Sequence, residues 1–250
     1  MSRKANQDQV VRFSGPERVQ HLMVMLLFIT LALTGFPQKF HETGWARFLV
    51  HAMGGIGEMR FVHRTAGLLF AALALVHLTM AIAAVLAGRS KLAMVPTRKD
   101  FQDTVTTLRY YLRLSEVRAQ FDRFDYREKF EYWGIVIGGI IMIVTGFVLF
   151  FPIVITRFLP GELVPAAKVA HSNEGLMAFL VVITWHIYNV HFAPEVFPFN
   201  KTIFTGKMDR ERMRHEHALE YARRFPEDDS GSGGHDEPAA PAAGSDPGDK

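Results

Sequence analysis

The segment HSNEGLMAFLVVITWHIYNVHF, residues 171–192, decides the fold because it places three histidines in an almost unbroken apolar stretch. Residues 175–194 form an uncharged run of 20 residues, and a helix rising about 1.5 Å per residue crosses a hydrocarbon core of about 30 Å in that length. Three more uncharged runs, residues 19–38, 65–88 and 132–156, are 20 to 25 residues long. Four such runs predict an all-α integral membrane protein, a bundle of four transmembrane helices.

The distribution of Lys and Arg predicts how the chain crosses the membrane. The segments before the first run, between the second and third, and after the fourth carry 22 of the 28 Lys and Arg residues, and the other two connections carry six. The positive-inside rule therefore places both termini in the cytoplasm. The polar N-terminus lacks the apolar region of a signal peptide, so we expect the first span to be uncleaved. Because this asymmetry accounts for the basic residues, we predict no nucleic-acid partner.

The sequence divides into four parts. We predict a cytoplasmic N-terminus (1–18), a membrane domain (19–194) with a cytoplasmic loop at 89–130, a charged tail helix within 195–225, and a disordered tail (226–250) rich in Gly, Ser, Pro and acid. In the loop, Thr97 and Asp100 indicate a helix start, and apolar residues follow at helical spacing from Phe101 to Leu112. That helix lies either on the inner membrane surface or packed against protein.

Histidines lie at two depths in the predicted spans, where an ionisable side chain is costly and usually marks a functional site. His77 follows His63 by 14 residues in the second span, and His186 follows His171 by 15 in the fourth. These separations correspond to about 21 and 22 Å and return each helix to nearly the same face. His21, about one turn into the first span, lies at the level of His77 and His186. The spans therefore carry an outer and an inner layer of imidazoles.

Two layers of imidazole are what two stacked b-type haems require, since each low-spin iron binds one imidazole from each of two helices. The chain has no cysteine, which excludes disulfides, thiolate metal sites, iron–sulfur clusters and covalently attached haem. Haem iron is the only metal that we predict. Arg64 and Lys168 are candidate partners of haem propionates or, equally, interfacial cations. Small residues that allow a helix to pass close to a haem are Gly35, Gly67, Gly146 and Gly175.

Four segments carry a family resemblance: RFSGPERVQHLMVMLLFITLALTGF (12–36), HRTAGLLFAALALVHL (63–78), REKFEYWGIVIGGIIMIVTG (127–146) and the opening segment. In this order and spacing they resemble the di-haem cytochrome b (gamma) subunits of respiratory formate dehydrogenases and nickel–iron hydrogenases, which are grouped with bacterial cytochrome b561-like proteins. The resemblance covers about residues 12–207. It implies a multi-pass protein of the bacterial inner membrane.

The resemblance also implies the ligands and the quinone site. It assigns the outer haem to His63 and His171, and the inner haem to His21 and His186. Family members exchange electrons with menaquinone or ubiquinone near the inner haem, in a pocket to which the start of the third span contributes. The candidates there are Asp125, Glu128 and Lys129, whose other interpretation is surface charge at the start of a helix.

The chain departs from the family pattern in having His77 and His191. By spacing alone, His77 competes with His21 for the inner haem, although the matching segment ERVQH favours His21. A third haem held by His77 and His191 is the remaining alternative. The other histidines are assigned to the surface: His41, His51, His215 and His217.

The leading hypothesis is transmembrane electron transfer between an extracytoplasmic partner and quinone. The implied partners are iron–sulfur or dehydrogenase subunits, or a multihaem cytochrome c, and membrane lipid surrounds the spans. We assign no dehydrogenase chemistry to this chain. A transporter that uses the histidines for metal ions or protons is one alternative, and a haem-free membrane anchor is another.

Overall fold

The computed structural model describes residues 8–88, 92–194 and 196–227. This part of the chain contains four helices long and apolar enough to cross a membrane. They are α1 (Gly15–Lys39), α3 (Ile56–Leu86), α5 (Tyr126–Phe150) and α7 (Leu163–Val181), the last extended by the π-helical segments η1 (Val182–His186) and η2 (Tyr188–Phe192). The predicted bundle of four membrane helices is confirmed. Most of the predicted disordered tail, from residue 228 on, lies outside the described residues.

Local sequence sets where the spans begin. Before α1, the carboxylate of Glu17 accepts hydrogen bonds from the backbone N–H and the hydroxyl of Ser14, both at 2.7 Å. Before α5, the Asp125 side chain accepts from the backbone N–H groups of Arg127 and Glu128, at 2.8 and 2.9 Å. Both are capping boxes, which satisfy backbone donors that a helix leaves free at its start.

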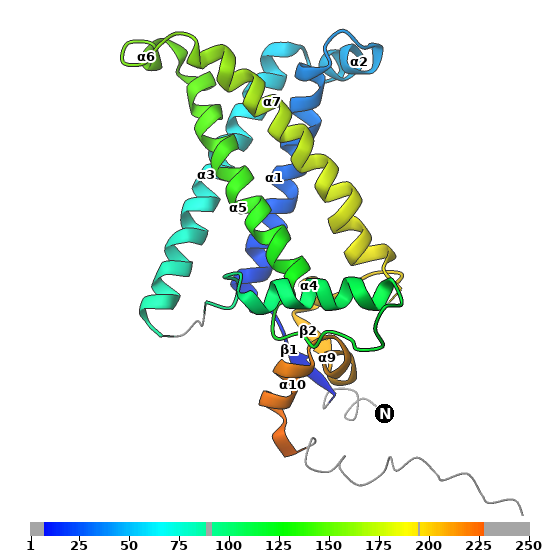
Figure 1. Ribbon diagram of the computed structural model, residues 1–250. Coiled ribbons are helices and arrows are strands. Elements are labelled where there is room, and N and C mark those ends of the chain that lie inside the picture. Colours follow the sequence, from blue (N-terminus) through cyan, green and yellow to red (C-terminus); the bar gives the residue numbers. More distant parts are fainter. Residues whose placement is uncertain (1–7, 89–91, 195, 228–250) are drawn as a thin grey trace, which may run out of the picture.

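The spans pack as two antiparallel pairs. α1 lies along α3 and α5 lies along α7, and the pairs meet where α1 contacts α7 and α3 contacts α5. In Figure 1 the spans are close together at the end that carries the short helices α2 (Gly44–Ala52) and α6 (Pro152–Ile155), and they spread apart toward the other end. We call these ends the α2/α6 end and the α4 end.

The outward faces of the spans are apolar. Leu33, Leu75, Ile140 and Leu180 are all more than half exposed, and each lies on a different span. A helix that is apolar on the side away from its neighbours is stable in lipid. The bundle is therefore that of a multi-pass membrane protein.

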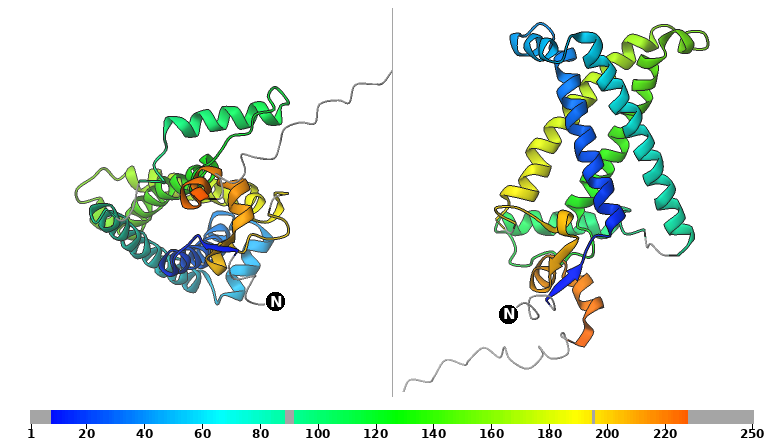
Figure 2. Two further views of the ribbon diagram at one scale, coloured as in Figure 1. Left: turned by 90° about the horizontal axis from the view of Figure 1, so that it is seen from below. Right: turned by 180° about the vertical axis from the view of Figure 1, so that it is seen from behind.

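Helix α4 (Arg98–Tyr111) lies beside the lower end of the bundle, at a large angle to the spans (Figures 1 and 2). It begins after Thr97, whose backbone N–H and hydroxyl donate to Asp100 at 2.6 and 2.8 Å. The helix start predicted from Thr97 and Asp100 is thus present. Asp100 also accepts from the Lys129 ammonium at 2.7 Å, which joins α4 to the start of α5.

Segments near the two ends of the described chain meet below the bundle in a small unit that we call the terminal cap. Strand β1 (Gln9–Val11) pairs antiparallel with β2 (Lys207–Asp209), with Val10 opposite Met208, and helices α8 (Thr202–Thr205), α9 (Arg210–Glu216) and α10 (Ala218–Arg224) complete it. The sequence predicts a charged helix over 207–224, whereas the structure divides this stretch into a strand and two short helices. Gly206, in a left-handed conformation at φ 76°, turns the chain into β2.

A buried ion pair holds the terminal cap together. The Arg12 guanidinium lies 2.6 Å from the Glu220 carboxylate, and both side chains are almost fully buried. His217 lies beside them: its Nδ1 is 2.7 Å from the Asp122 carbonyl oxygen and its Nε2 is 3.3 Å from Arg12 Nη2. The assignment of His217 to the surface is therefore wrong, because its partners, distant in sequence, enclose it. Burial and the neighbouring Arg12 charge lower the pKa of His217 to about 4.

Candidate haem sites

The bundle contains two pairs of histidines, one toward each end. Within each pair the two rings face each other. His63 on α3 and His171 on α7 form the outer pair, with ring centroids 6.2 Å apart. His21 on α1 and His186 in η1 form the inner pair, with ring centroids 6.3 Å apart. In both pairs the partners come from different helices, and the pairs correspond to the two layers expected from the sequence.

Threonines fix the orientation of the outer pair. The Thr34 hydroxyl donates to the Thr30 carbonyl at 2.7 Å, so its oxygen accepts from His63 Nδ1 at 2.9 Å. Thr145 repeats the arrangement, bonded to the Ile141 carbonyl at 2.6 Å and to His171 Nδ1 at 2.9 Å. With its single proton directed to a carbonyl, each hydroxyl accepts the imidazole N–H. This selects the tautomer in which Nε2 carries a free lone pair, as a metal ligand requires.

A glycine follows each of these threonines and leaves room for the imidazole. A Cβ at Gly35 would lie 3.2 Å from His63 Cε1, and a Cβ at Gly146 would lie 3.4 Å from His171 Cε1. Of the other two predicted glycines, Gly175 lies against Met142 and Gly67 faces open space. The triplet Thr-Gly-Phe occurs at 34–36 and again at 145–147. This short repeat is the sequence signal for the two threonines, which histidine spacing and hydropathy alone do not indicate.

A carboxylate fixes the orientation of the inner pair. His186 Nδ1 lies 2.8 Å from Glu131 Oε2, and the other Glu131 oxygen accepts from the Asn189 side-chain amide at 3.3 Å. Glu131 was missed from sequence because it stands one residue before the uncharged run of the third span. The hydrogen bond engages Nδ1 and leaves His186 Nε2 as the free ring nitrogen.

The two additional histidines have other contacts. His77 Nδ1 lies 2.8 Å from the Gln20 side-chain oxygen, and His77 Nε2 lies 3.1 Å from the Tyr132 hydroxyl. His191 stacks on Phe199, with ring centroids 4.8 Å apart. His21 therefore faces His186, whereas both ring nitrogens of His77 are hydrogen-bonded to Gln20 and Tyr132.

The geometry of both pairs fits a bis-histidine haem. Two iron–nitrogen bonds of about 2 Å, with about 1 Å from each nitrogen to its ring centre, separate the ring centroids by about 6 Å. The observed 6.2 and 6.3 Å match this spacing. Free Nε2 atoms on His63, His171 and His186 supply the donors. The residues present are therefore suited to hold a non-covalent haem at each level.

The candidate propionate partners lie near the outer pair in different settings. The Arg64 guanidinium stands over the Phe150 ring, 5.2 Å from its centroid, and Lys168 is exposed on α7. Each remains a candidate for an anionic group at that end of the bundle.

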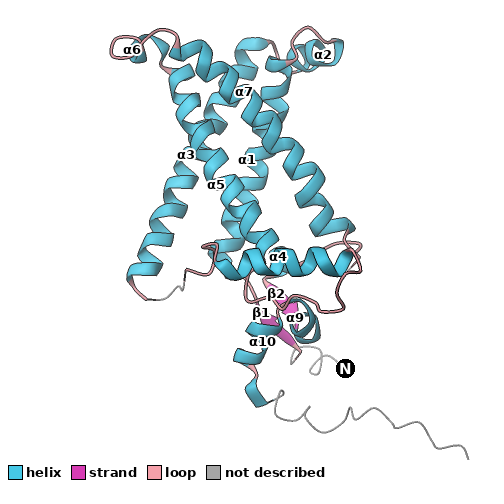
Figure 3. Cartoon of the chain, in the orientation of Figure 1, coloured by secondary structure: helices cyan, strands magenta, loops and turns pink. Residues whose placement is uncertain are grey.

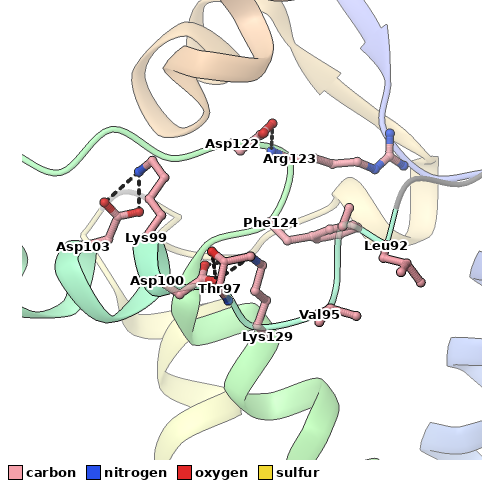
Figure 4. A pocket seen from close by; sticks show the side chains of 11 residues that line it. Leu92, Val95, Thr97, Lys99, Asp100, Asp103, Asp122, Arg123, Phe124 and Lys129 are labelled. Carbon is pink, nitrogen blue, oxygen red and sulfur yellow. Dashed lines mark hydrogen bonds and ion pairs between the residues drawn. The ribbon is translucent and has the colours of Figure 1, made fainter.

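The quinone candidates take part in local structure at the start of α5. Asp125 is buried and also pairs with Arg127 at 2.7 Å, while the Glu128 carboxylate accepts from the Asp125 backbone N–H at 2.9 Å. Lys129, paired with Asp100, lines a pocket (Figure 4). Asp125 and Lys129 are thus buried rather than surface charges. The pocket is lined by residues of the 92–97 segment, α4, the 122–124 segment and α5.

A second pocket opens beside the inner pair, lined by Gly15, Arg18, Val19, His21, Leu22, Ile203 and Phe204. Its walls are mainly apolar, and it lies between the start of α1 and α8. A ligand there would lie directly against one member of the inner pair.

Comparison with known proteins identifies the family of the chain. Residues 12–198 match the family described as prokaryotic cytochrome b561. The chain is 24% identical over 184 residues to the formate dehydrogenase cytochrome b556(fdo) subunits of Escherichia coli K12, O6:H1 (strain CFT073) and O157:H7, covering 72% of this chain and 78% of each relative. The family match spans all four membrane helices and both histidine pairs, so the chain belongs to the prokaryotic cytochrome b561 family.

Proposed function

We propose that this membrane cytochrome b conducts electrons across the membrane between an extracytoplasmic redox partner and quinone, with one b-type haem at each histidine pair. The observation that carries the proposal is the presence of two pairs with ring centroids 6.2 and 6.3 Å apart. Bound b-type haem supplies reversible one-electron transfer. The chain supplies ligands and their orientation at two depths.

At the outer site, His63 and His171 would be the ligands. Thr34 and Thr145 hold their Nδ1–H groups, and Gly35 and Gly146 leave room for the rings. Arg64 and Lys168 would neutralise propionates near the α2/α6 end. Because the hydrogen bonds to Nδ1 fix the orientation of each imidazole, each ligand is ready to bind without rearrangement.

At the inner site, we assign His21 and His186 as ligands in preference to His77. Two observations support this choice: His21 faces His186, and both ring nitrogens of His77 are hydrogen-bonded. The contacts of His191 with Phe199 favour a role in packing over a third haem site.

Quinone would bind at the α4 end, close to the inner pair. The apolar pocket beside His21 suits a quinone ring, and the pocket that Lys129 lines offers polar groups nearby. Reduction of a quinone to a quinol consumes two protons along with two electrons. With the α4 end in the cytoplasm, as the charge distribution indicates, those protons would come from the cytoplasm.

The α2/α6 end would receive the redox partner. The relatives are, by name, cytochrome subunits of formate dehydrogenase, which supports a dehydrogenase or iron–sulfur subunit as the partner. A multihaem cytochrome c would make the same use of an outer haem. The chain itself then serves as the electron-transferring and quinone-reactive subunit of an oxidoreductase complex.

The test is a dithionite-reduced minus oxidised spectrum of the purified chain, with haem counted by pyridine haemochrome. We expect two b-type haems per chain, loss of one in His63→Ala, and loss of the other in His21→Ala. His191→Ala and the outer-loop variant His41→Ala serve as controls and should keep both. Absence of a b-type spectrum would contradict the proposal and favour the transporter or anchor alternatives. Oxidation of the reduced haems by a quinone analogue tests the quinone role separately.

A further inference from the structure

The two histidine pairs differ in the charge of the groups that hold them. Both outer rings bond to threonine hydroxyls, which are neutral. At the inner pair, His186 bonds to the Glu131 carboxylate at 2.8 Å, and the side chains are only 31% and 20% exposed. The chain therefore places a carboxylate against one of the two sites, within a membrane span where a charged group is costly.

The position of Glu131 is held from both sides. One of its oxygens accepts from His186 in η1 and the other accepts from Asn189 in η2. These two partners lie three residues apart in the π-helical part of the fourth span, and π-helical segments in proteins are frequently found at functional sites. Glu131 itself lies on α5, so the contact also joins the third and fourth spans.

A carboxylate that accepts a hydrogen bond from a ligand imidazole makes that imidazole a stronger electron donor. Its negative charge also stabilises the more positive, oxidised state of the iron over the reduced state. Charge and hydrogen bonding around the ligands are among the main means by which a protein sets a haem potential. A threonine hydroxyl provides the hydrogen bond without the charge.

We propose that Glu131 is a positioning residue that lowers the reduction potential of the inner haem through its hydrogen bond to His186. The outer haem, whose ligands His63 and His171 are held by neutral threonine hydroxyls, receives no such contribution. Glu131 thereby sets part of the difference in reduction potential between the inner and the outer haem. This inference rests on the proposed function, since it requires a haem at the inner pair.

Redox titration of the purified full chain, followed in the b-type absorption bands, tests the proposal. Glu131→Gln keeps an oxygen that accepts the Nδ1–H of His186 and removes the charge, so we expect the inner midpoint potential to rise. Glu131→Asp keeps the charge, so we expect a potential nearer to that of the unaltered chain. The inner component is identified by its loss in His21→Ala.

The matched control is Glu174→Gln, which removes another carboxylate from the bundle. Glu174 lies against Gly138 of α5 and stands 12 residues, about 18 Å along the helix, before His186. We expect it to leave the inner potential unchanged. A merely structural role of Glu131 would instead change haem occupancy without a charge-dependent shift of potential.

Four outcomes separate the inference from the proposed function. An unaltered chain without b-type bands contradicts the proposed function itself. Two bound haems whose inner potential is the same in Glu131→Gln and in the unaltered chain overturn the role of Glu131 and leave the function standing. Loss of the inner haem in both Glu131→Gln and Glu131→Asp also overturns it. If only Glu131→Gln loses that haem and Glu131→Asp keeps it at an unchanged potential, Glu131 controls haem occupancy without a measured shift of potential, and this also overturns the proposal.

Discussion

Single side chains in this protein are defined by partners far away in the sequence. His217 is the clearest case: it is almost fully buried, and it donates to Asp122 and faces Arg12, 95 and 205 residues away. Nδ1 carries the proton and Nε2 faces a guanidinium, so a second proton would be buried beside a positive charge. Burial and Arg12 consequently lower the pKa of His217 to about 4.

The low pKa of His217 predicts how the terminal cap responds to acid. Above pH 6.5 the histidine is neutral in both the folded and the unfolded cap and has no effect on stability. As the pH falls from 6.5 to 4, only the unfolded cap takes up a proton on His217. The free energy of unfolding of the cap therefore decreases by about 3 kcal/mol, because one pKa unit corresponds to about 1.4 kcal/mol. Hydrogen exchange of residues 207–224, compared between variants at each pH, should show this loss of protection.

His217→Asn retains a donor toward Asp122 and cannot be protonated, so its cap should lose much less protection over this range. The exposed neighbour His215 provides the control, since His215→Asn should behave like the unaltered chain. Glu220, Asp122 and Asp125 also lie close to His217 and are acidic, but they are common to all three proteins. Equal acid sensitivity of His217→Asn and the unaltered chain would contradict a buried neutral histidine.

At the level of elements, helix α4 carries an apolar stripe that no described part of the chain covers. Phe101 is 73% exposed and Leu108 57% exposed, and the stripe continues through Val105 and Leu112. Asp100, about a quarter turn from Phe101, pairs with Lys129 of α5. Because α4 lies beside the lower ends of the spans at a large angle to them (Figures 1 and 2), an apolar face there is suited to the membrane surface.

We therefore expect the stripe of α4 to contact lipid. The chain has no cysteine, so Leu108→Cys can carry a single environment-sensitive fluorophore in reconstituted vesicles. Brominated lipid should quench this label strongly. A label at Gln102→Cys, which is also exposed but lies about a quarter turn from Phe101, should be quenched less. Equal quenching at the two positions would place the stripe away from lipid.

The same elements show how far sequence can predict this fold. The spans can be predicted because lipid requires long apolar helices, but the uncharged runs do not locate the helix ends. Helix α3 begins at Ile56, nine residues before the uncharged run that predicts it, because Arg60 and Arg64 interrupt the apolar pattern. Histidine depths predicted two layers, whereas the choice between His21 and His77 depends on helix rotation and on Gln20 and Tyr132, which spacing cannot specify. Nor could spacing place Arg12 against Glu220.

At the scale of the whole molecule, the bundle is two similar halves. α1 with α3 and α5 with α7 each place a Thr-Gly pair against a histidine of the partner helix. Strands β1 and β2 and helix α4 lie at one end of the bundle (Figure 1), and the segments at that end carry most of the Lys and Arg. We propose from this distribution that the α4 end faces the cytoplasm.

Single cysteines can also test this orientation. In intact spheroplasts, a membrane-impermeant maleimide should label Glu42→Cys, next to α2, and should leave Glu116→Cys, after α4, unlabelled. Permeabilised membranes should give labelling at both positions and so show that both are accessible. The reverse pattern in spheroplasts would invert the topology and place quinone reduction at the opposite face.

The pairing of β1 with β2 also determines when the protein can finish assembling. Val10 leaves the ribosome before any of the four spans, but its partner Met208 is made nearly 200 residues later, after all four spans. Glu220, the partner of Arg12, is made later still. The first strand is therefore unpaired throughout membrane insertion, and its closure marks a chain whose last helix has been inserted. A chain that ends after the fourth span but before residue 207 is therefore a bundle whose strand β1 is still without its partner.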